Sequence, residues 1–164
     1  MNATAIVYTS ATGYTARYAA LLSEKLALPV HTLADAAKSL PAGTPIIYMG
    51  WLMAGSVKDY RKAAKRFAIE AVIGVGLGDT GAQDDAARKA CKLPADVPVF
   101  TVQGGMDVNK LQGPYRIAIK LLTKAMSAQK NPTPADARMT ELLQKGGDYV
   151  SEKELTAVLA WAEK

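Results

Sequence analysis

Short apolar runs alternate with longer stretches of helical periodicity along most of the chain. Runs of apolar and β-branched residues, typical of strands buried on both faces, cover residues 4–9, 29–33, 45–50, 71–78 and 99–103. Helical spacing covers residues 13–26, 57–67, 83–91, 115–128, 134–145 and 151–163. This alternation is typical of βαβ units, so it predicts an α/β fold with a parallel sheet and helices on both faces.

Turn residues separate these elements, and no interdomain linker interrupts them. Glycine- and proline-containing turns lie at residues 41–43, 104–105, 131–133 and 146–148. Ser151-Glu152-Lys153-Glu154 has the sequence of a capping box at the start of the last helix. The 164 residues contain no internal repeat, and they are predicted to form a single domain over residues 1–164.

Composition and charge narrow the class of protein only slightly. The formal net charge is +5, and Lys and Arg gather at residues 58–66 and 120–130. Such groups usually mark solvated helix faces, although they can attract an acidic partner, a phosphate or an anionic membrane surface. There is no nucleic-acid-binding motif, no apolar run long enough for a transmembrane segment and no visible secretory signal, so we expect a cytoplasmic protein for which peripheral membrane contact stays open.

The lone cysteine and the lone histidine limit the available chemistry. One cysteine, Cys91, excludes an intramolecular disulfide and a Cys-based metal cluster. We expect Cys91 to be a small buried hydrophobe or a half-exposed thiol, and His31 to be an imidazole at the end of a strand. No catalytic or metal-binding residue is predicted.

The strongest candidate for a binding site is the turn between the first strand and the first helix. It consists of Ser10, Ala11, Thr12, Gly13, Tyr14 and Thr15, with three candidate hydroxyl donors and neither lysine nor carboxylate. A helix N-terminus presents backbone N–H groups and the positive end of the helix dipole, which together bind phosphate. The turn lacks the Gly-Lys-Ser/Thr of nucleotide hydrolases and the spaced glycines of dinucleotide-binding folds. Taken alone, it is explained about equally well by Ser10 and Thr12 as helix caps.

The connection after the third predicted strand is unusually apolar. It comprises Trp51, Leu52, Met53, Ala54 and Gly55. Ligands of open parallel sheets lie beyond the carboxyl ends of the strands, where this loop and the turn at residues 10–15 converge. Large apolar side chains in a surface loop suit the flat isoalloxazine ring of a flavin. The alternative is that Trp51 packs under the loop as part of the core.

The connection after the fourth predicted strand is rich in glycine. Gly78, Asp79, Thr80 and Gly81 can place backbone groups against the pyrimidine edge of a flavin. Alternatively, Asp79 is a simple cap of the next helix.

With these three loops, the chain resembles the flavodoxin family over essentially its whole length. Residues 8–15, Tyr-Thr-Ser-Ala-Thr-Gly-Tyr-Thr, are similar to the phosphate signature that follows the first strand in that family. The resemblance implies a flavodoxin-like three-layer sandwich with a five-stranded parallel sheet of order 2-1-3-4-5. It also implies an FMN cofactor with its phosphate on residues 10–15 and its ring between residues 51–55 and 78–81.

Residues 104–111 and 115–122 further resemble the flavodoxin-like branch that includes menaquinone-dependent protoporphyrinogen dehydrogenase. The stretch 78–94 is short and helical in pattern where that enzyme has a long loop, and this chain is basic where electron-carrier flavodoxins are acidic. Because the loop after the fourth strand has no aromatic residue, one flavin face is expected to be open to substrate or covered by Tyr115.

The resemblance implies electron transfer or flavin-dependent reduction, which is the activity of an FMN-dependent oxidoreductase. The partner would be a redox protein or a small-molecule acceptor such as a quinone. The alternatives are a protoporphyrinogen or quinone oxidoreductase and a flavodoxin-shaped binding module without flavin.

Overall fold

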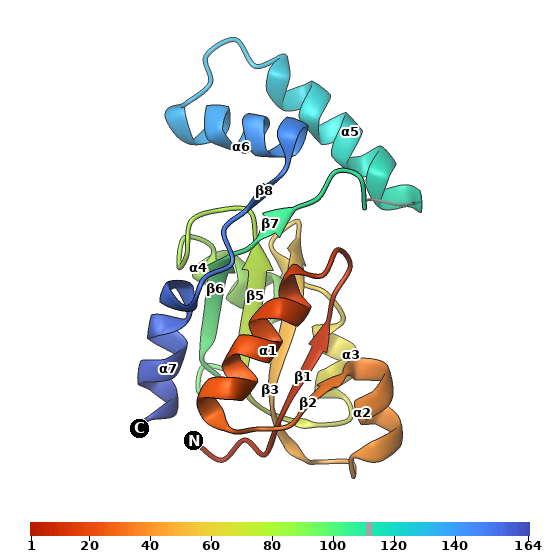
Figure 1. Cartoon of the computed structure of the whole chain (residues 1–164), viewed down its shortest axis with the longest axis vertical. Helices are drawn as coiled ribbons and strands as arrows, with labels where there is room; N and C mark the ends of the chain where they lie inside the picture. Colours follow the sequence, from red (N-terminus) through yellow and green to blue (C-terminus); the bar gives the residue numbers. More distant parts are fainter. Residues whose placement is uncertain (111–112) are drawn as a thin grey trace.

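The computed structural model describes residues 1–110 and 113–164 and has a parallel β-sheet at its centre (Figure 1). The hydrogen-bonded strand order is β2-β1-β3-β5-β6, and the short strand β4 (Ser56–Val57) pairs antiparallel with the end of β3. The parallel strands are β1 (Ala5–Thr9), β2 (Val30–Thr32), β3 (Pro45–Met53), β5 (Ala68–Gly76) and β6 (Val99–Gln103). The predicted α/β class and the order 2-1-3-4-5 of the parallel strands are confirmed.

Helices cover both faces of the sheet. The helices α2 (Leu33–Ser39), α3 (Tyr60–Ala64) and α4 (Asp84–Cys91) pack on one face. The other face carries α1 (Tyr14–Leu26), the 3-10 turn η1 (Glu152–Leu155) and α7 (Thr156–Ala162).

Successive residues of each strand contribute to opposite cores. In β3, Ile46 and Tyr48 pack into the core of α2, α3 and α4, whereas Ile47 and Met49 pack into the core of α1 and α7. Neighbouring side chains of a strand point to opposite faces, so a strand covered on both faces must be apolar at every position. This is why the strands are continuous apolar runs in the sequence.

Residues 105–110 and 113–148 extend from the carboxyl edge of the sheet (Figure 1). Strand β7 (Gly105–Met106) pairs antiparallel with β8 (Gly147–Asp148) in a small ribbon. Above it stand α5 (Gly113–Ser127) and α6 (Pro134–Lys145), which we call the helical hairpin. Helix α6 buries Leu142 and Leu143, whereas α5, all of whose residues are described, buries none.

Several elements differ from the sequence prediction. Helix α2 was not expected, and it begins at Leu33 because the Thr32 side chain accepts a hydrogen bond from the Asp35 N–H at 3.1 Å. The predicted strand 29–33 is shortened by one residue at each end, to Val30–Thr32, and the start of α2 accounts for its end at Thr32. The predicted helix 57–67 is reduced to α3, since β4 (Ser56–Val57) folds back onto β3. Strand β5 starts and ends earlier than the predicted run 71–78.

The capping box predicted at Ser151 is not formed. Among the described residues no side-chain hydrogen bond caps η1, and the Glu154 carboxylate instead accepts a hydrogen bond from the Thr80 hydroxyl. A capping box does form at α6, where the Asp136 N–H donates to Thr133 Oγ1 at 3.2 Å and the Thr133 N–H donates to Asp136 Oδ2 at 2.9 Å.

None of the helices formed by residues 1–110 and 113–164 combines the length and the apolar character of a membrane span.

Candidate functional site

The turn from Ser10 to Thr15 lies at the carboxyl end of β1 and leads directly into α1. The Gly13 N–H donates a hydrogen bond to Ser10 Oγ at 3.1 Å, and Gly13 itself has a φ of 99°. This left-handed conformation strains residues with a Cβ, so it accounts for the glycine. Gly13 is the N-cap of α1, and no described side chain caps the helix.

Neither Ser10 nor Thr12 is therefore a side-chain cap of α1, which answers the capping alternative for this turn. The first N–H groups of a helix have no partner within the helix. The side chains of Ser10 and Thr12 are half-buried, Ala11 is exposed and Thr15 is buried. Because the Ser10 hydroxyl acts as an acceptor toward Gly13, its own O–H stays available to donate. The turn thus has donors for a phosphate and no carboxylate to repel one.

The side chain of Tyr14 joins this turn to the β7–β8 ribbon. A Cβ added at Gly105 would lie 2.6 Å from Tyr14 Cε1 and 2.3 Å from the carbonyl oxygen of Gly147. The Arg17 guanidinium lies 5.8 Å from the Tyr14 ring centroid and pairs with Asp148 at 2.6 Å. Burial raises the pKa of Tyr14, and the nearby carboxylates of Asp148 and Asp107 raise it further. The Tyr14 side chain is thus engaged in packing, which leaves its backbone N–H for a ligand.

The predicted loop at residues 51–55 is in large part strand. Strand β3 continues to Met53, and the pairs Leu52–Val57 and Met53–Ser56 join it to β4. Only Ala54 and Gly55 form the turn between the strands, with φ values of 49° and 76°. The prediction that Trp51, Leu52 and Met53 lie in a loop was wrong, because pairing with β5 and β4 lengthens the strand, whereas their predicted role beside a flavin stays a prediction.

The three large side chains of this segment have different environments. The Leu52 side chain covers β5, since a Cβ added at Gly74 or Gly76 would lie 2.9 or 2.8 Å from it. Trp51 is half-buried, and its ring and that of Tyr115 of α5 meet edge to face, with centroids 5.1 Å apart and planes at 87°. Met53 is 45% exposed. Of the three, Leu52 is engaged in the sheet, and the Trp51–Tyr115 pair is the aromatic surface at this edge.

The turn Gly78–Gly81 is fastened to β6 and η1. The Gln103 N–H donates to Thr80 Oγ1 at 2.9 Å, the Gly81 N–H donates to the Thr101 carbonyl at 2.8 Å, and the Thr80 hydroxyl donates to Glu154. The N-cap of α4 is Gln83, so the alternative that Asp79 caps this helix is wrong.

The Asp79 carboxylate lies on the outside of the molecule. It is 3.9 Å from the Arg138 guanidinium of α6, and both side chains are largely exposed, at 75% and 70%. An exposed pair at this distance contributes little to stability, so Asp79 remains accessible beside the helical hairpin.

A hollow of about 710 Å³ adjoins the turn from Ser10 to Thr15 on the side of β2. We call it the α2–α3 hollow; its lining includes Ser10, Ala11 and Gly13 of the turn, Leu33, Ala34 and Ala37 of α2, and Asp59, Lys62 and Arg66. Lys62 pairs with Asp59 at 2.8 Å, and this hydrogen bond raises the pKa of Lys62. Two cations and one carboxylate therefore face the hollow.

The structure brings only the first of the three predicted loops to this hollow. Neither residues 51–55 nor residues 78–81, all of which are described, line it. The contribution of α2 was missed because that helix was not predicted. Lys62 and Arg66 belong to the basic group at residues 58–66, which is the sequence signal for the cationic side of this hollow.

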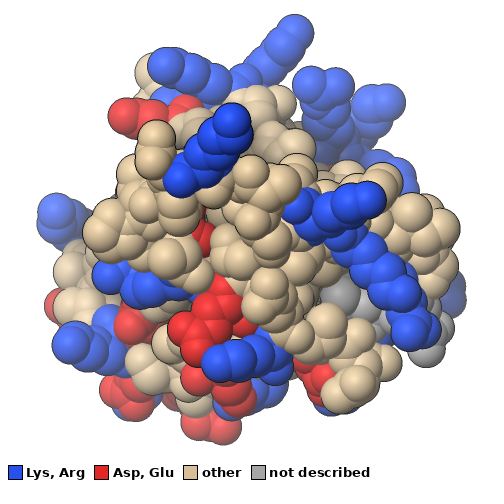
Figure 2. All heavy atoms as spheres, turned by 90° about the horizontal axis from the view of Figure 1, so that it is seen from above, with Lys and Arg blue, Asp and Glu red and all other residues tan. Residues whose placement is uncertain are grey.

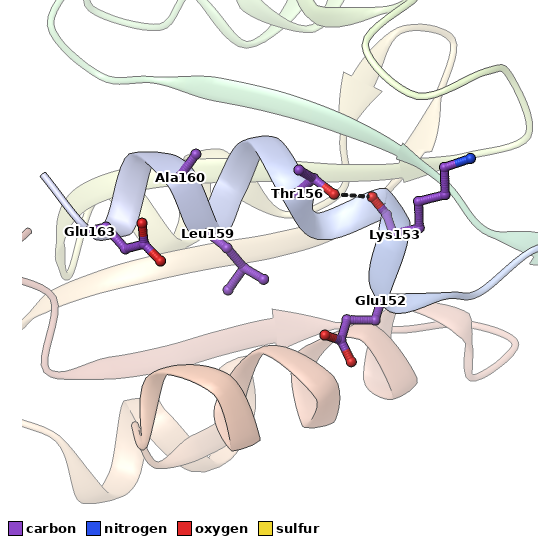
Figure 3. Close-up of a pocket in the computed structure, with 6 residues that line it drawn as sticks. All are labelled: Glu152, Lys153, Thr156, Leu159, Ala160 and Glu163. Atoms are coloured by element: carbon purple, nitrogen blue, oxygen red, sulfur yellow. Dashed lines mark hydrogen bonds between the residues drawn. The ribbon is translucent and has the colours of Figure 1, made fainter.

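A second hollow, of about 390 Å³, runs along α7. Figure 3 shows its lining residues Glu152, Lys153, Thr156, Leu159, Ala160 and Glu163. Within it, the Thr156 hydroxyl donates to the Lys153 carbonyl at 2.6 Å. None of the predicted site residues lines this hollow, and its two glutamates disfavour an anionic ligand.

Cys91 is 3% exposed and its Sγ accepts a hydrogen bond from the Val57 N–H at 3.3 Å. Cys91 is therefore a buried core residue, which is the first of its two predicted roles. Among the described residues, no group of three or more His, Cys, Asp or Glu side chains is placed to hold a metal ion.

Comparisons of the chain with protein family models, with curated proteins and with solved structures found no match.

Proposed function

We propose that this chain is a flavodoxin-like protein that binds FMN and takes part in electron transfer or flavin-dependent reduction. The observation that carries the proposal is the turn from Ser10 to Thr15, which lies at the carboxyl end of β1 before the N-terminus of α1. In open parallel sheets this edge is where ligands bind, and a helix N-terminus with a glycine-containing turn is suited to a phosphate. The strand order β2-β1-β3-β5-β6 and the two helical layers support the flavodoxin-like assignment.

The residues of the turn fit a phosphate group. The hydroxyls of Ser10 and Thr12 and the backbone N–H groups at the start of α1 would hold it. Donors fixed before the ligand arrives hold an anion without the cost of ordering them. The Trp51–Tyr115 pair would supply aromatic surface for the ring, and Gly78–Gly81 would supply backbone groups. FMN supplies one- and two-electron redox chemistry, and the chain would anchor and orient it.

Titration of FMN with the full-length protein, followed by flavin fluorescence, tests this proposal. We expect quenching on binding, and we expect Ser10→Ala with Thr12→Ala to weaken binding on the order of 100-fold, because two hydrogen bonds to a charged group are lost. Thr123→Ala, a half-buried helical threonine of α5, is the matched control and should leave the affinity unchanged. No quenching in excess FMN would remove the proposal.

A second candidate is a binding module that uses the same turn for another anion without flavin. It is favoured by the α2–α3 hollow, which joins the turn to Lys62 and Arg66 but excludes residues 51–55 and 78–81. Calorimetry with inorganic pyrophosphate separates the two. Under this alternative, Lys62→Gln with Arg66→Gln abolishes pyrophosphate binding and FMN does not bind. Under the flavin proposal, FMN binds and Trp51→Ala weakens its binding.

Within the flavin proposal, a protoporphyrinogen or quinone oxidoreductase is favoured by the contact between Trp51 and Tyr115. The contact joins Trp51, a predicted neighbour of the flavin, to the segment 115–122, which is one of the two that resemble the dehydrogenase branch. Of the other segment, residues 104–111, Leu111 lies outside the described residues. Turnover of protoporphyrinogen with a menaquinone analogue by the FMN-loaded protein is the test, and its absence removes this activity alone.

A further inference from the structure

Helix α5 is amphipathic, but its apolar side is turned outward. Residues four apart in a helix stack into rows along its surface. One row, Tyr115, Ile119 and Thr123, is half-buried. Next to it lies a fully basic exposed row of Arg116, Lys120 and Lys124, followed by an exposed apolar row of Ile117, Leu121 and Ala125. The fourth row, Ala118, Leu122 and Met126, is also apolar.

The exposure of the apolar rows is large. Ile117 and Leu121 are each 63% exposed and Leu122 is 47% exposed, so three of the chain's large exposed hydrophobic residues lie on this single helix. Adjacent exposed apolar residues on a folded protein mark an interaction surface rather than ordinary surface scatter. We call Ile117, Leu121 and Leu122, with the small residues between them, the α5 apolar face.

Most of the net charge of the chain lies beside this face. Residues 113–132 contain the four basic residues Arg116, Lys120, Lys124 and Lys130 and no acidic residue, so they carry +4 of the net charge of +5. The acidic residues of the neighbouring helix α6, Asp136 and Glu141, are each engaged locally, with Thr133 and with Lys145. The positive charge around the apolar face is therefore not neutralised by its neighbour.

The hairpin presents this face at one end of the molecule. It stands beyond the carboxyl edge of the sheet in Figure 1, and Figure 2 looks down on this end, where Lys and Arg side chains project around a broad surface of uncharged residues. The β7–β8 ribbon and the contact of Tyr115 with Trp51 connect the helical hairpin to the central sheet and the helices that cover it, which we call the sheet domain.

We propose that α5 lies flat on an anionic lipid surface, with its apolar face in the boundary between headgroups and acyl chains. A helix with an apolar face and a cationic row beside it is the arrangement that binds in this plane, and each basic residue near an anionic surface adds to the affinity. The long side chains of Arg116, Lys120 and Lys124 can keep their charges among the headgroups while Ile117 and Leu121 insert. This inference does not depend on the proposed flavin.

Charge favours a lipid surface over a second copy of the chain as the occupant. In a symmetric dimer through this face, the same patch meets itself, so two unbalanced basic rows would face one another. Like charges opposed across an interface are repulsive. An anionic lipid surface, in contrast, neutralises the basic row and also covers the apolar face.

Vesicle flotation of the full-length protein tests the proposal. We expect the protein to float with vesicles of phosphatidylcholine and phosphatidylglycerol and to remain in the dense fraction with vesicles of phosphatidylcholine alone. Salt should release it from the anionic vesicles. Lys120→Gln with Lys124→Gln should weaken partitioning about 25-fold, because each basic residue contributes about fivefold. Ile117→Ser with Leu121→Ser should weaken it at least about tenfold, because buried apolar area is lost.

The matched controls remove positive charge or an exposed apolar side chain from parts of the chain outside α5. Lys38→Gln with Lys89→Gln removes two exposed lysines of α2 and α4, and Val30→Ser removes an exposed apolar residue of β2. Both should float like the natural sequence, and circular dichroism should show all variants folded, since every substituted side chain is exposed.

Other outcomes overturn the proposal. Equal flotation of the Lys120/Lys124 variant and its control would show that the basic row has no role. Failure of the unaltered protein to float, with a dimer in light scattering that Ile117→Ser and Leu121→Ser abolish, would assign the face to a second copy. Failure to float as a monomer would leave no lipid interaction.

Discussion

Helices α1 and α5 have similar lengths and similar apolar spacing, yet they have opposite relations to the core. Helix α1 buries Thr15, Tyr18, Ala19 and Leu22 against the sheet, whereas α5 buries none of its residues. The pattern along the chain marks an apolar stripe in both cases, but it does not say what covers it. The comparison shows that an amphipathic pattern predicts a helix with an apolar stripe, and that this chain buries residues of that stripe in α1 but none in α5.

The largest difference between the two helices is expected from loss of a leucine. Leu22→Ala, at a side chain with no exposed surface, should lower the free energy of unfolding by about 2–5 kcal/mol, since it leaves a cavity. Leu121→Ala in α5 should change it by less than about 0.5 kcal/mol, because the side chain is 63% exposed. Urea unfolding measures both. Equal losses would show that α5 is covered in solution.

The junction between the sheet domain and the helical hairpin should be sensitive to a single methyl group. Gly105→Ala places a Cβ 2.3 Å from the Gly147 carbonyl oxygen and should cost about 1–3 kcal/mol through overpacking of the ribbon. Hydrogen exchange should show faster opening of residues 105–148, with the sheet domain less affected. Gly78→Ala is the control, because its Cβ would meet neighbours only at 3.5 Å or more.

A smaller effect, seen at alkaline pH, should separate the buried Tyr18 of α1 from the exposed Tyr149, which follows β8. The buried Tyr18 hydroxyl donates to the Gln103 carbonyl, and Tyr18→Phe should cost about 1 kcal/mol. Burial raises the pKa of Tyr18 from 10.0 to about 12, so its contribution to stability is complete below pH 10.0 and is lost as the pH rises toward 12. The variant should lack this part of the alkaline loss in urea unfolding, whereas Tyr149→Phe, at an exposed tyrosine, should retain it.

The smallest effect concerns the ion pair between α1 and β8. The hydrogen bond from Arg17 lowers the pKa of Asp148, so the contribution of this pair is present above the ordinary value of 3.8 and is lost as the pH falls through the lowered pKa. Both side chains are 51% exposed, so Asp148→Asn should change stability by only a few tenths of a kcal/mol, and less in salt. Asp96→Asn, an exposed carboxylate, is the control. A loss above 1 kcal/mol, about the most that an exposed pair contributes, would show that this pair fastens the hairpin.

Elements whose signals are local agree well with the sequence prediction. The strand 99–103 and the helix 134–145 have the predicted bounds, because Pro98 and the double glycine delimit the first and the capping residue Thr133 begins the second. Errors occur where a distant contact competes. Strand β3 runs past residue 50 because Trp51 pairs with Val75 of β5, and the Glu154 carboxylate accepts a hydrogen bond from the Thr80 hydroxyl instead of capping its own helix.

The candidate site was predicted in part. The turn at residues 10–15 is at the carboxyl end of β1 as expected, since a strand followed directly by a helix defines it locally. The second predicted loop was wrong in its secondary structure, because Trp51, Leu52 and Met53 belong to β3 and Leu52 fills the space over Gly74 and Gly76. The FMN assignment itself stays a prediction.

The order of apolar runs and helical stretches was enough to establish the α/β class, because burial on both faces imposes an apolar character that is visible residue by residue. Hydroxyl and glycine positions were likewise enough to locate the turn before α1. Only the tertiary structure decided what each apolar stripe meets: the sheet for α1, open surface for α5. That outcome depends on contacts between residues far apart in the chain, such as the β7–β8 pairing that carries the hairpin, and a local pattern contains no information about them.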